Sequence, residues 1–342
     1  MSNQPPIEVP QGAIRLNTDS QKLEFFAQDR WYEFATDGEA TGLGGRAFRC
    51  AGGTYPAATV IETFNIATQG NSIDTGFDLS QSTNESGRAS SRTRALLGGG
   101  YTGGGNGNTY IQFFEMNALA NSIDFGDLTV QMGRNAGTSN NTRALFMGAV
   151  SNVNNVINFV TISHTGNASD FGDMSTNIEG PTGIGNRTRA IFGGGQGPNP
   201  YPMLNNIEFV TIASTGNSVD FGDLTAARTS PMGLSNSTRG LFVAGNTSGA
   251  NTNAIDFITI TSTGNGQDFG DMSKEKSQMG GTASNATRGV FFGGYMVSSP
   301  NNNNSIQFVT IATTGDSNSF GDLASKGGGG VVGCCDSHGG VI

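Results

Sequence analysis

The chain has 342 residues, a formal net charge of −9, 53 glycines and only 13 % charged residues. A chain of this length exceeds one ordinary hydrophobic core and predicts either two domains or one large repeat array. Its acidic balance argues against a nucleic-acid partner, because phosphate backbones are repelled by a negative surface. No run approaches the eighteen apolar residues of a membrane-spanning helix, so no membrane insertion is expected.

The N-terminal segment, residues 1–34, predicts a three-stranded β-meander with strands at 13–16, 22–26 and 31–34. Three strands with one apolar face are marginal alone, so the module is expected to attach to copies of itself or to another protein. The apolar side chains expected to make this attachment are Leu16, Phe25, Trp31 and Phe34. The glycine-rich residues 35–45 are predicted to form a linker.

The first six residues contain neither a basic start nor an apolar stretch. A signal peptide requires both, so none is expected and synthesis in a cytosol is predicted. The three cysteines are too few and too unevenly placed for a disulfide framework.

Residues 46–342 contain six copies of one repeat. Phe-Gly-Asp followed by Leu or Met, or an irregular relative, recurs at intervals of 46 to 51 residues, with its closing Asp at positions 78, 127, 173, 223, 271 and 322. A Thr-Arg-apolar marker runs in step, with its arginine at positions 46, 94, 143, 189, 239 and 288. A third marker, Ile-x-Phe-x-Thr-Ile, occupies 157–162, 207–212, 255–260 and 306–311 with small variations. Such self-similarity indicates a repeat architecture.

Each repeat predicts four short strands. In the fourth repeat these are 188–192, 207–213, 218–224 and a strand within 229–234. The segments are rich in β-branched and aromatic residues and are bounded by Gly, Asn or Ser. No window shows a sustained apolar period of 3.6 residues, so helices are expected to be scarce and the fold all-β.

Stacking four-stranded sheets around an axis buries their faces and leaves only short edges, and a repeat of this length suits one such blade. The sequence therefore predicts a six-bladed β-propeller after the N-terminal meander. Residues 335–342 align with residues 235–242, so a C-terminal strand is predicted to complete the first blade and close the ring. The alternative is an open array with a frayed tail.

The Gly-Gly after each first strand and the repeat length resemble kelch-type propellers. One departure is that kelch repeats carry a Tyr and Trp pair, whereas the single tryptophan here, Trp31, precedes the repeats. Residues 46–335 more closely resemble the glycine-rich repeats of kelch-like proteins from cyanophages and other marine phages. Residues 12–20 and 22–26, with Trp31, resemble a small module of phage tail-fibre and other virion proteins.

This resemblance implies a structural protein of the phage tail or tail fibre, made in the host cytoplasm and located in the virion. The N-terminal module would bind other tail proteins, and the propeller would bind a host-surface glycan or protein for attachment. A homo-oligomer such as a trimer fits this role. Two alternatives remain: a purely structural decoration or baseplate protein, and a polysaccharide depolymerase.

The repeated Asp pairs, such as Asp170 and Asp173, permit three interpretations. Carboxylates could bind calcium, which prefers several oxygen ligands. They could act as a general acid and base in glycan cleavage, which requires two carboxyl groups in different environments. Their repetition in every unit favours a structural role, in which one Asp caps a turn and the other binds the arginine of a Thr-Arg strand. We therefore expect a binding protein rather than an enzyme, with no required cofactor.

Cys334, Cys335, Asp336 and His338 form the single local group of soft metal ligands. Adjacent cysteines seldom chelate one metal well, and zinc requires four suitably spread ligands. We expect the cysteines to act as small buried hydrophobic residues in the closing strand and no metal site to form.

The segment after each first strand varies most among the repeats and is predicted to lie on one side of the propeller. Loops on a rigid scaffold commonly carry recognition, and Tyr, Asn, Ser and Gly are typical of adaptable binding loops. The candidate binding residues are Tyr101, Asn106, Asn154, Asn199, Tyr201, Asn246, Asn251, Tyr295 and Asn302. The alternative is that these are solvated loops without a ligand.

Overall fold

The computed structural model describes residues 9–17, 22–28, 30–33, 45–52, 58–102, 107–118, 120–148, 155–248, 250–273, 280–294, 304–325 and 327–341. The chain divides into two compact units, Met1–Thr41 and Gly42–Ile342, and the division falls inside the predicted linker. Every regular element in the described ranges is a β-strand, which confirms the all-β prediction. No helix of these ranges is long and apolar enough to cross a membrane.

The N-terminal unit contains one antiparallel sheet of β1 (Ile14–Asn17), β2 (Lys22–Ala27) and β3 (Arg30–Glu33), in that order. Phe25 and Trp31, which are both expected to make the attachment, lie on opposite faces of this sheet. Phe26 pairs with Trp31 and Phe25 pairs with Tyr32, and successive strand residues point to opposite faces. Leu16 lies on the Phe25 face, whereas the guanidinium of Arg15 lies 4.1 Å from the ring centroid of Trp31 on the other face. Phe34 lies outside the described residues.

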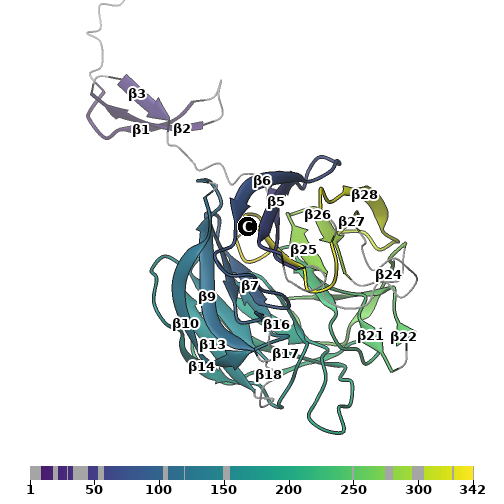
Figure 1. Cartoon of the computed structure of the whole chain (residues 1–342). Coiled ribbons are helices and arrows are strands. Elements are labelled where there is room, and N and C mark those ends of the chain that lie inside the picture. The colour runs from purple at the N-terminus through teal and green to yellow at the C-terminus, as the bar shows by residue number, and fades with distance from the viewer. Residues whose placement is uncertain are drawn as a thin grey trace, which may run out of the picture. The chain divides into compact units, whose positions relative to one another are not determined.

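The C-terminal unit contains six four-stranded antiparallel sheets in its described part (Figure 1). In order across each sheet the strands are β29 (Val332–Cys335), β4 (Arg46–Cys50), β5 (Val60–Asn65) and β6 (Ile73–Asp78); β7 (Gly87–Ser90), β8 (Arg94–Gly98), β9 (Asn108–Glu115) and β10 (Ile123–Met132); β11 (Ala136–Ser139), β12 (Arg143–Met147), β13 (Val156–Thr161) and β14 (Ser169–Asp173); β15 (Thr182–Gly185), β16 (Arg189–Gly193), β17 (Asn206–Thr211) and β18 (Val219–Asp223); β19 (Met232–Ser235), β20 (Arg239–Val243), β23 (Ala254–Thr259) and β24 (Gln267–Asp271); β25 (Gly281–Ser284), β26 (Arg288–Phe292), β27 (Ser305–Thr310) and β28 (Asn318–Asp322). A small hairpin of β21 (Asn246–Thr247) and β22 (Ala250–Asn251) is inserted before β23.

The sequence led us to expect that the fourth strand of each repeat pairs with the other strands of that repeat. Instead it pairs with the first strand of the next repeat. After β18 the chain crosses to the neighbouring sheet, where β19 pairs with β20 from Met232↔Val243 to Ser235↔Gly240. Each sheet is thus built from two consecutive repeats, because its innermost strand comes from the preceding one. For the first sheet that strand is β29, which pairs with β4 from Val332↔Cys50 to Cys335↔Ala47.

The repeat arginine ties each sheet to the next. Arg143 Nη1 donates to the carbonyl of Ile212, 2.8 Å away, and the guanidinium lies 4.9 Å from the ring centroid of Phe159. The equivalent donations run from Arg46 to Met116, Arg94 to Ile162, Arg189 to Ile260, Arg239 to Ile311 and Arg288 to Ile66. The last of these joins the sixth sheet to the first.

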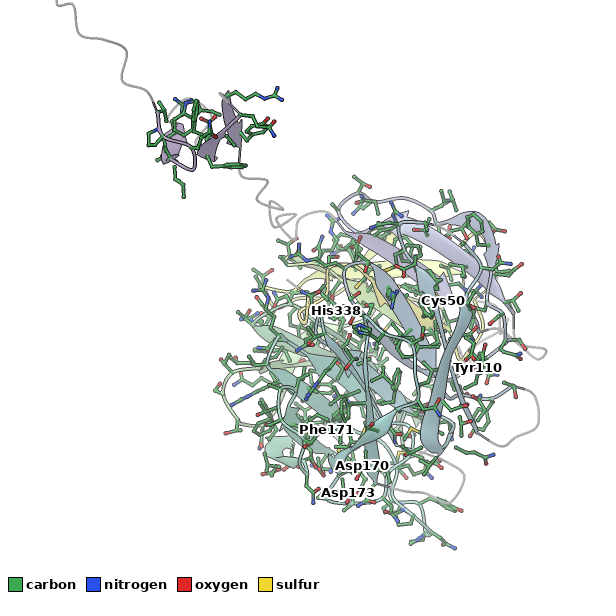
Figure 2. All side chains as sticks on the ribbon, turned by 90° about the vertical axis from the view of Figure 1, so that its left-hand side faces the viewer. Cys50, Tyr110, Asp170, Phe171, Asp173 and His338 are labelled. Carbon is green, nitrogen blue, oxygen red and sulfur yellow. The ribbon has the colours of Figure 1, made fainter. Side chains whose placement is uncertain are left out.

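The expectation that these arginines bind the repeat aspartates is therefore wrong. Asp170 lies on the surface and accepts from the backbone N–H of Gly172, so it caps the bulge in β14 (Figure 2). The backbone N–H of Asp173 donates to Asn217 Oδ1 of the next sheet. The bulge orients the carboxylates of Asp170 and Asp173 away from the core. Arg143 instead donates to the carbonyl of Ile212, just after the end of β17 in the neighbouring sheet.

A buried polar residue follows the Ile that begins the third marker in every repeat, although in the first repeat Thr63 stands in place of the Phe. The six residues are at most 3 % exposed and are Glu62, Gln112, Asn158, Glu208, Asp256 and Gln307. Glu208, for example, accepts from the backbone N–H of Ser175, 3.0 Å away, and from the hydroxyls of Ser175 and Ser218. The equivalent donors to the other five also come from the chain leaving the preceding sheet. Sheets are therefore joined by polar contacts as well as apolar packing.

Replacing one repeat arginine tests this junction. Arg189→Leu removes a charge-assisted bond to Ile260 and a contact with the Phe209 ring, so we expect a loss of about 2 kcal/mol in unfolding free energy. Urea unfolding followed by circular dichroism measures this loss. Arg187→Leu, at an exposed neighbour, should stay within about 0.5 kcal/mol of the wild type. Equal effects of the two substitutions would contradict the proposed role of Arg189.

Candidate binding face and central cavity

The variable segments lie at the same ends of their sheets as the connections between sheets, because the strands are antiparallel. Isolated bridges join the two kinds of segment: Tyr101 pairs with Asn84, Gln196 with Glu179, and Asn246 with Thr229. We call the described residues of these segments the loop face, comprising residues 79–86, 99–102, 107, 133–135, 174–181, 194–205, 224–231, 244–248 and 250–253. Asn106, Asn154, Tyr295 and Asn302 lie outside the described residues.

Charged residues from three sheets meet on the loop face. Arg134 Nε lies 3.2 Å from Glu85 Oε2, and Arg134 Nη1 lies 3.2 Å from Glu179 Oε1. Tyr101 is half-buried beside them and packs against Gly133, whose added Cβ would lie 2.8 Å from the Tyr101 ring. We call Glu85, Tyr101, Arg134 and Glu179 the mouth cluster. One arginine shared between two carboxylates leaves a net negative charge there.

Burial perturbs two members of the mouth cluster. Desolvation raises the pKa of Glu85, and the charge of Glu179 adds to this, while Arg134 opposes it. Desolvation also raises the pKa of Tyr101 to about 12, with the charge of Glu85 as the next cause. Perturbed titratable groups that converge on an accessible face are typical of functional sites.

The backbone beneath the mouth cluster is strained. Glu85, Arg134 and Ser230 have φ values of 55°, 50° and 55°, in the left-handed region that favours glycine. Backbone bonds link these positions between sheets: Gly180 N–H donates to Arg134 O at 2.9 Å, and Ser230 N–H donates to Gly180 O at 2.8 Å. Such conformations cost about 1–3 kcal/mol each and gather at functional sites. The equivalent position in two other repeats is a glycine with positive φ, Gly180 and Gly330, which is the signal that the sequence offers.

The structure brings some of the predicted binding residues together and leaves others apart. Asn246 Nδ2 donates to Asn251 Oδ1 at 3.2 Å, within the hairpin β21–β22. Tyr101 belongs to the mouth cluster. Asn199 is exposed, and Tyr201 beside it is 53 % exposed with a φ of 63°. Tyr201 therefore presents an aromatic surface to solvent, as a stacking residue would.

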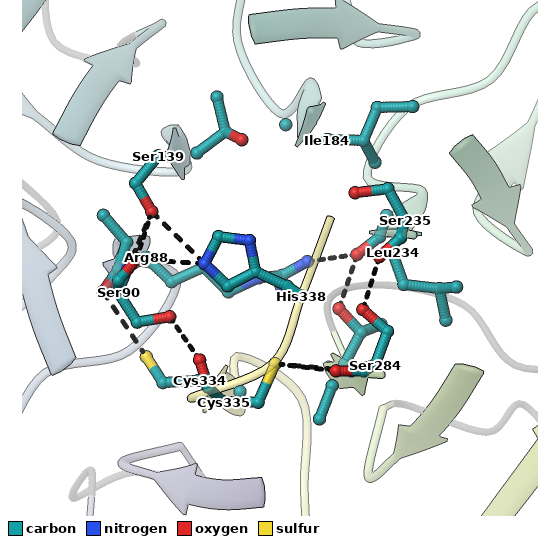
Figure 3. A pocket seen from close by; sticks show the side chains of 18 residues that line it. Arg88, Ser90, Ser139, Ile184, Leu234, Ser235, Ser284, Cys334, Cys335 and His338 are labelled. Atoms are coloured by element: carbon teal, nitrogen blue, oxygen red, sulfur yellow. Dashed lines mark hydrogen bonds between the residues drawn. The ribbon is translucent and has the colours of Figure 1, made fainter. Parts of the chain in front are cut away.

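A central cavity of about 50 Å³ lies between the innermost strands of the six sheets (Figure 3). Residues of β7, β11, β15, β19, β25 and β29 line it, together with His338. Hydroxyls on its wall donate to the neighbouring strand: Ser139 Oγ to Ser90 O, Ser90 Oγ to Cys335 O, and Ser284 Oγ to Ser235 O, each at 2.7 Å. These three hydroxyl groups therefore donate to backbone carbonyls of the wall and not to a ligand in the cavity.

The C-terminal residues after β29 cover one end of the central cavity. His338 Nε2 donates to Ser90 O at 3.0 Å, and Gly340 N–H donates to His338 Nδ1 at 3.1 Å. One ring nitrogen donates and the other accepts, so the imidazole is neutral. Desolvation is the largest cause that lowers the pKa of His338, the bond to Ser90 opposes it and the charge of Arg88 adds to it, and together they set the pKa at about 4. A Cβ on Gly340 would lie 1.9 Å from Ser139 O, so only glycine fits there.

Cys334 and Cys335 are buried on opposite faces of β29, each within a different apolar cluster. In the part of the chain that the structure describes, no group of three or more His, Cys, Asp or Glu side chains is placed to hold a metal. The ring nitrogens of His338 are both engaged within the protein.

The neutral state of His338 predicts an acid-sensitive contribution to stability. Its pKa is about 4 when folded and about 6.5 when unfolded, so the unfolded chain binds more protons between these values. The contribution of His338 to the unfolding free energy is fully present above pH 6.5. It is lost as the pH falls towards 4, and the loss is at most about 3 kcal/mol. Urea unfolding from pH 7.5 to 4 measures it.

His338→Gln keeps a donor and an acceptor at this site without a titratable group. The difference between wild type and His338→Gln should therefore shrink or reverse as the pH falls from 6.5 to 4. This comparison also removes the contribution of Glu85, whose raised pKa acts in the opposite direction. Parallel curves for the two proteins across this range would show that His338 does not titrate as described.

No protein-family model matches the chain, and no curated protein matches it. Its function must therefore be inferred from the repeat, the loop face and the central cavity.

Proposed function

We propose that the chain is a binding protein of a phage virion, with its six sheets as the blades of a closed six-bladed propeller. The loop face would bind a host-surface glycan or protein, and the N-terminal sheet would attach the chain to the tail or tail fibre. One observation carries the proposal. The contacts between sheets repeat in every unit, whereas the residues on the loop face differ from unit to unit.

The repeated contacts support the propeller. Six arginine–carbonyl bonds and six buried polar residues join each sheet to the next, and Arg288 joins the sixth to the first. The pairing of β29 with β4 links the two ends of the repeat array within one sheet. Radial repetition of this kind leaves only short strand edges unpaired.

The chemistry of the loop face supports binding. Tyr201 offers an exposed ring, Asn199 offers an amide, and the mouth cluster offers carboxylates and a guanidinium. Aromatic stacking combined with several hydrogen-bonding groups suits a polyhydroxylated ligand such as a glycan. The mostly rigid framework beneath would hold these groups without a large ordering cost.

The exposed apolar residues of the N-terminal sheet support attachment. Ile14 and Leu16 are 63 % and 60 % exposed and lie on the face that also holds Phe25. A three-stranded sheet with an uncovered apolar face gains stability by packing against a partner. The partner would be another tail protein or further copies of the same module, as in a trimer.

Binding of the full chain to host cells and to purified envelope glycans tests the proposal. We expect Tyr201→Ala to weaken binding about tenfold or more, because aromatic anchors dominate interface energies. Its thermal midpoint should be unchanged, since the side chain is exposed. Val219→Ser, at an exposed position on the outer strand β18, is the matched control and should bind like the wild type.

Each alternative function has its own outcome. Binding to purified tail particles without binding to host cells or glycans would replace the proposal with a structural decoration or baseplate protein. Release of reducing sugar from the glycans would make the protein a depolymerase. Equal binding by wild type and Tyr201→Ala would remove Tyr201 from the binding site.

A further inference from the structure

Arg88 is the one charged residue at its position among the six innermost strands. The equivalent residues of the other five strands are Gly137, Gly183, Gly233, Thr282 and Gly333. The Arg88 side chain extends from β7 into the central cavity and donates through Nη2 to the carbonyl of Gly233 on β19 (Figure 3). In the order in which the sheets contact one another, β19 is three sheets from β7. The guanidinium therefore spans the cavity.

No carboxylate balances this charge among the described residues. The cavity is lined by Arg88, by the neutral His338, by the thiols of Cys334 and Cys335, and otherwise by uncharged residues. Glu85 lines a second cavity of about 40 Å³ that also contacts Arg88, but its carboxylate is bound to Arg134. Asp336 lies on the same segment as His338 and accepts from the backbone N–H of Arg46. Arg88 is half-buried, and a charge of one sign in a cavity with low-dielectric walls raises the local concentration of counter-ions.

We propose that the central cavity binds a monovalent inorganic anion of halide size against the guanidinium of Arg88. On the measure by which one water needs about 10–15 Å³, the cavity of about 50 Å³ has room for an ion of halide size beside the Arg88 guanidinium. The wall hydroxyls are committed to carbonyls, so Arg88 is the donor that selects for negative charge. Burial depresses the pKa of Arg88, which is the response expected of a charge lacking a partner.

The two ends of the central cavity differ in access. The residues from Asp336 to Val341 cover the end at His338, where the backbone of Gly340 approaches Ser139 closely. The second cavity adjoins the other end and is lined by Glu85, Ser86 and Ser230 of the loop face. An anion would therefore enter from the loop face. This inference does not depend on what the loop face itself binds.

Crystals of the full chain grown or soaked in sodium bromide test the proposal directly. We expect an anomalous scattering peak in the central cavity, within hydrogen-bonding distance of the Arg88 guanidinium. In solution, sodium chloride or bromide should raise the thermal midpoint above that in sodium gluconate at equal ionic strength, because a halide fits beside the Arg88 guanidinium and a six-carbon carboxylate is far larger. Arg187→Gln, at an exposed arginine, should keep both effects.

Arg88→Gln should abolish the bromide peak and the difference between halide and gluconate. The proposal would be overturned if the cavity holds only water in bromide crystals. It would also be overturned if a carboxylate of the chain forms an ion pair with Arg88. A peak of equal height in Arg88→Gln would overturn it as well. If that variant does not fold, the wild-type map and the wild-type salt comparison still decide the question.

Discussion

Deletion of residues 331–342 is expected to abolish cooperative folding. These residues supply β29, whose Val332, Cys334 and Cys335 are each 3 % exposed and pack in two apolar clusters. Their loss would expose the edge of β4 and the core around Phe48. It would also open the end of the central cavity that residues 336–341 cover in the full chain. Burial of Val331, Val332, Cys334 and Cys335 at about 1.5–3 kcal/mol each, with one strand pairing, is comparable to the usual stability of a whole domain.

Thermal unfolding by circular dichroism and limited trypsin digestion measure this effect. The truncated chain should lack a sharp transition and should be digested at sites that resist trypsin in the full chain. Deletion of residues 1–33 is the matched control, because the N-terminal unit is separate from the sheets. It should leave the transition of residues 42–342 in place. A truncated chain that unfolds as sharply as the full chain would mean that β29 does not hold the ends together.

Asp256→Ala is expected to destabilise the protein by about 3–5 kcal/mol, the usual cost of leaving a buried charge without its partner. Asp256 and Arg228 form an ion pair in which each side chain is 1 % exposed. Asp256 also accepts from the backbone N–H and the hydroxyl of Thr225, in the chain that leaves the preceding sheet. The substitution therefore removes a junction between sheets and leaves the Arg228 guanidinium without its ion-pair partner. Urea unfolding at pH 7 measures the loss.

The double variant Arg228→Met, Asp256→Leu separates the two causes. Replacing both partners of a buried pair by apolar residues is often neutral or stabilising. We expect the double variant to recover most of the loss, leaving the cost of the missing bonds to Thr225. Asp220→Ala, at an exposed carboxylate in β18, should change stability by less than about 0.5 kcal/mol. A small loss in Asp256→Ala would mean that Arg228 finds another partner or water.

Local signals in the sequence predicted the strands well. The expected strand 207–213 appears as Asn206–Thr211, and 218–224 appears as Val219–Asp223. Alternating apolar residues and glycine or asparagine turns act over a few residues, so they can be read from one repeat. The same signals placed the three N-terminal strands within two residues of their observed ends.

Features that depend on contacts between repeats could not be read in this way. The sequence does not show that β19 pairs with a strand of the next repeat. Nor does it show that Arg143 donates to the carbonyl of Ile212 rather than to an aspartate. The mouth cluster joins Glu85, Arg134 and Glu179 from three different repeats at non-landmark positions. One signal was available: the residue after this Ile is Glu, Gln, Asn or Asp in every repeat, and the sequence around it is Ile-x-Phe in five of them. Its regular polarity indicates a buried structural role.

An experimental density map of residues 42–342 tests the central claim most directly. The account predicts six four-stranded sheets around one axis, with residues 332–335 paired to residues 47–50 and Arg288 bonded to the carbonyl of Ile66. An open arc, a different number of sheets, or a C-terminal strand lying away from β4 would contradict it.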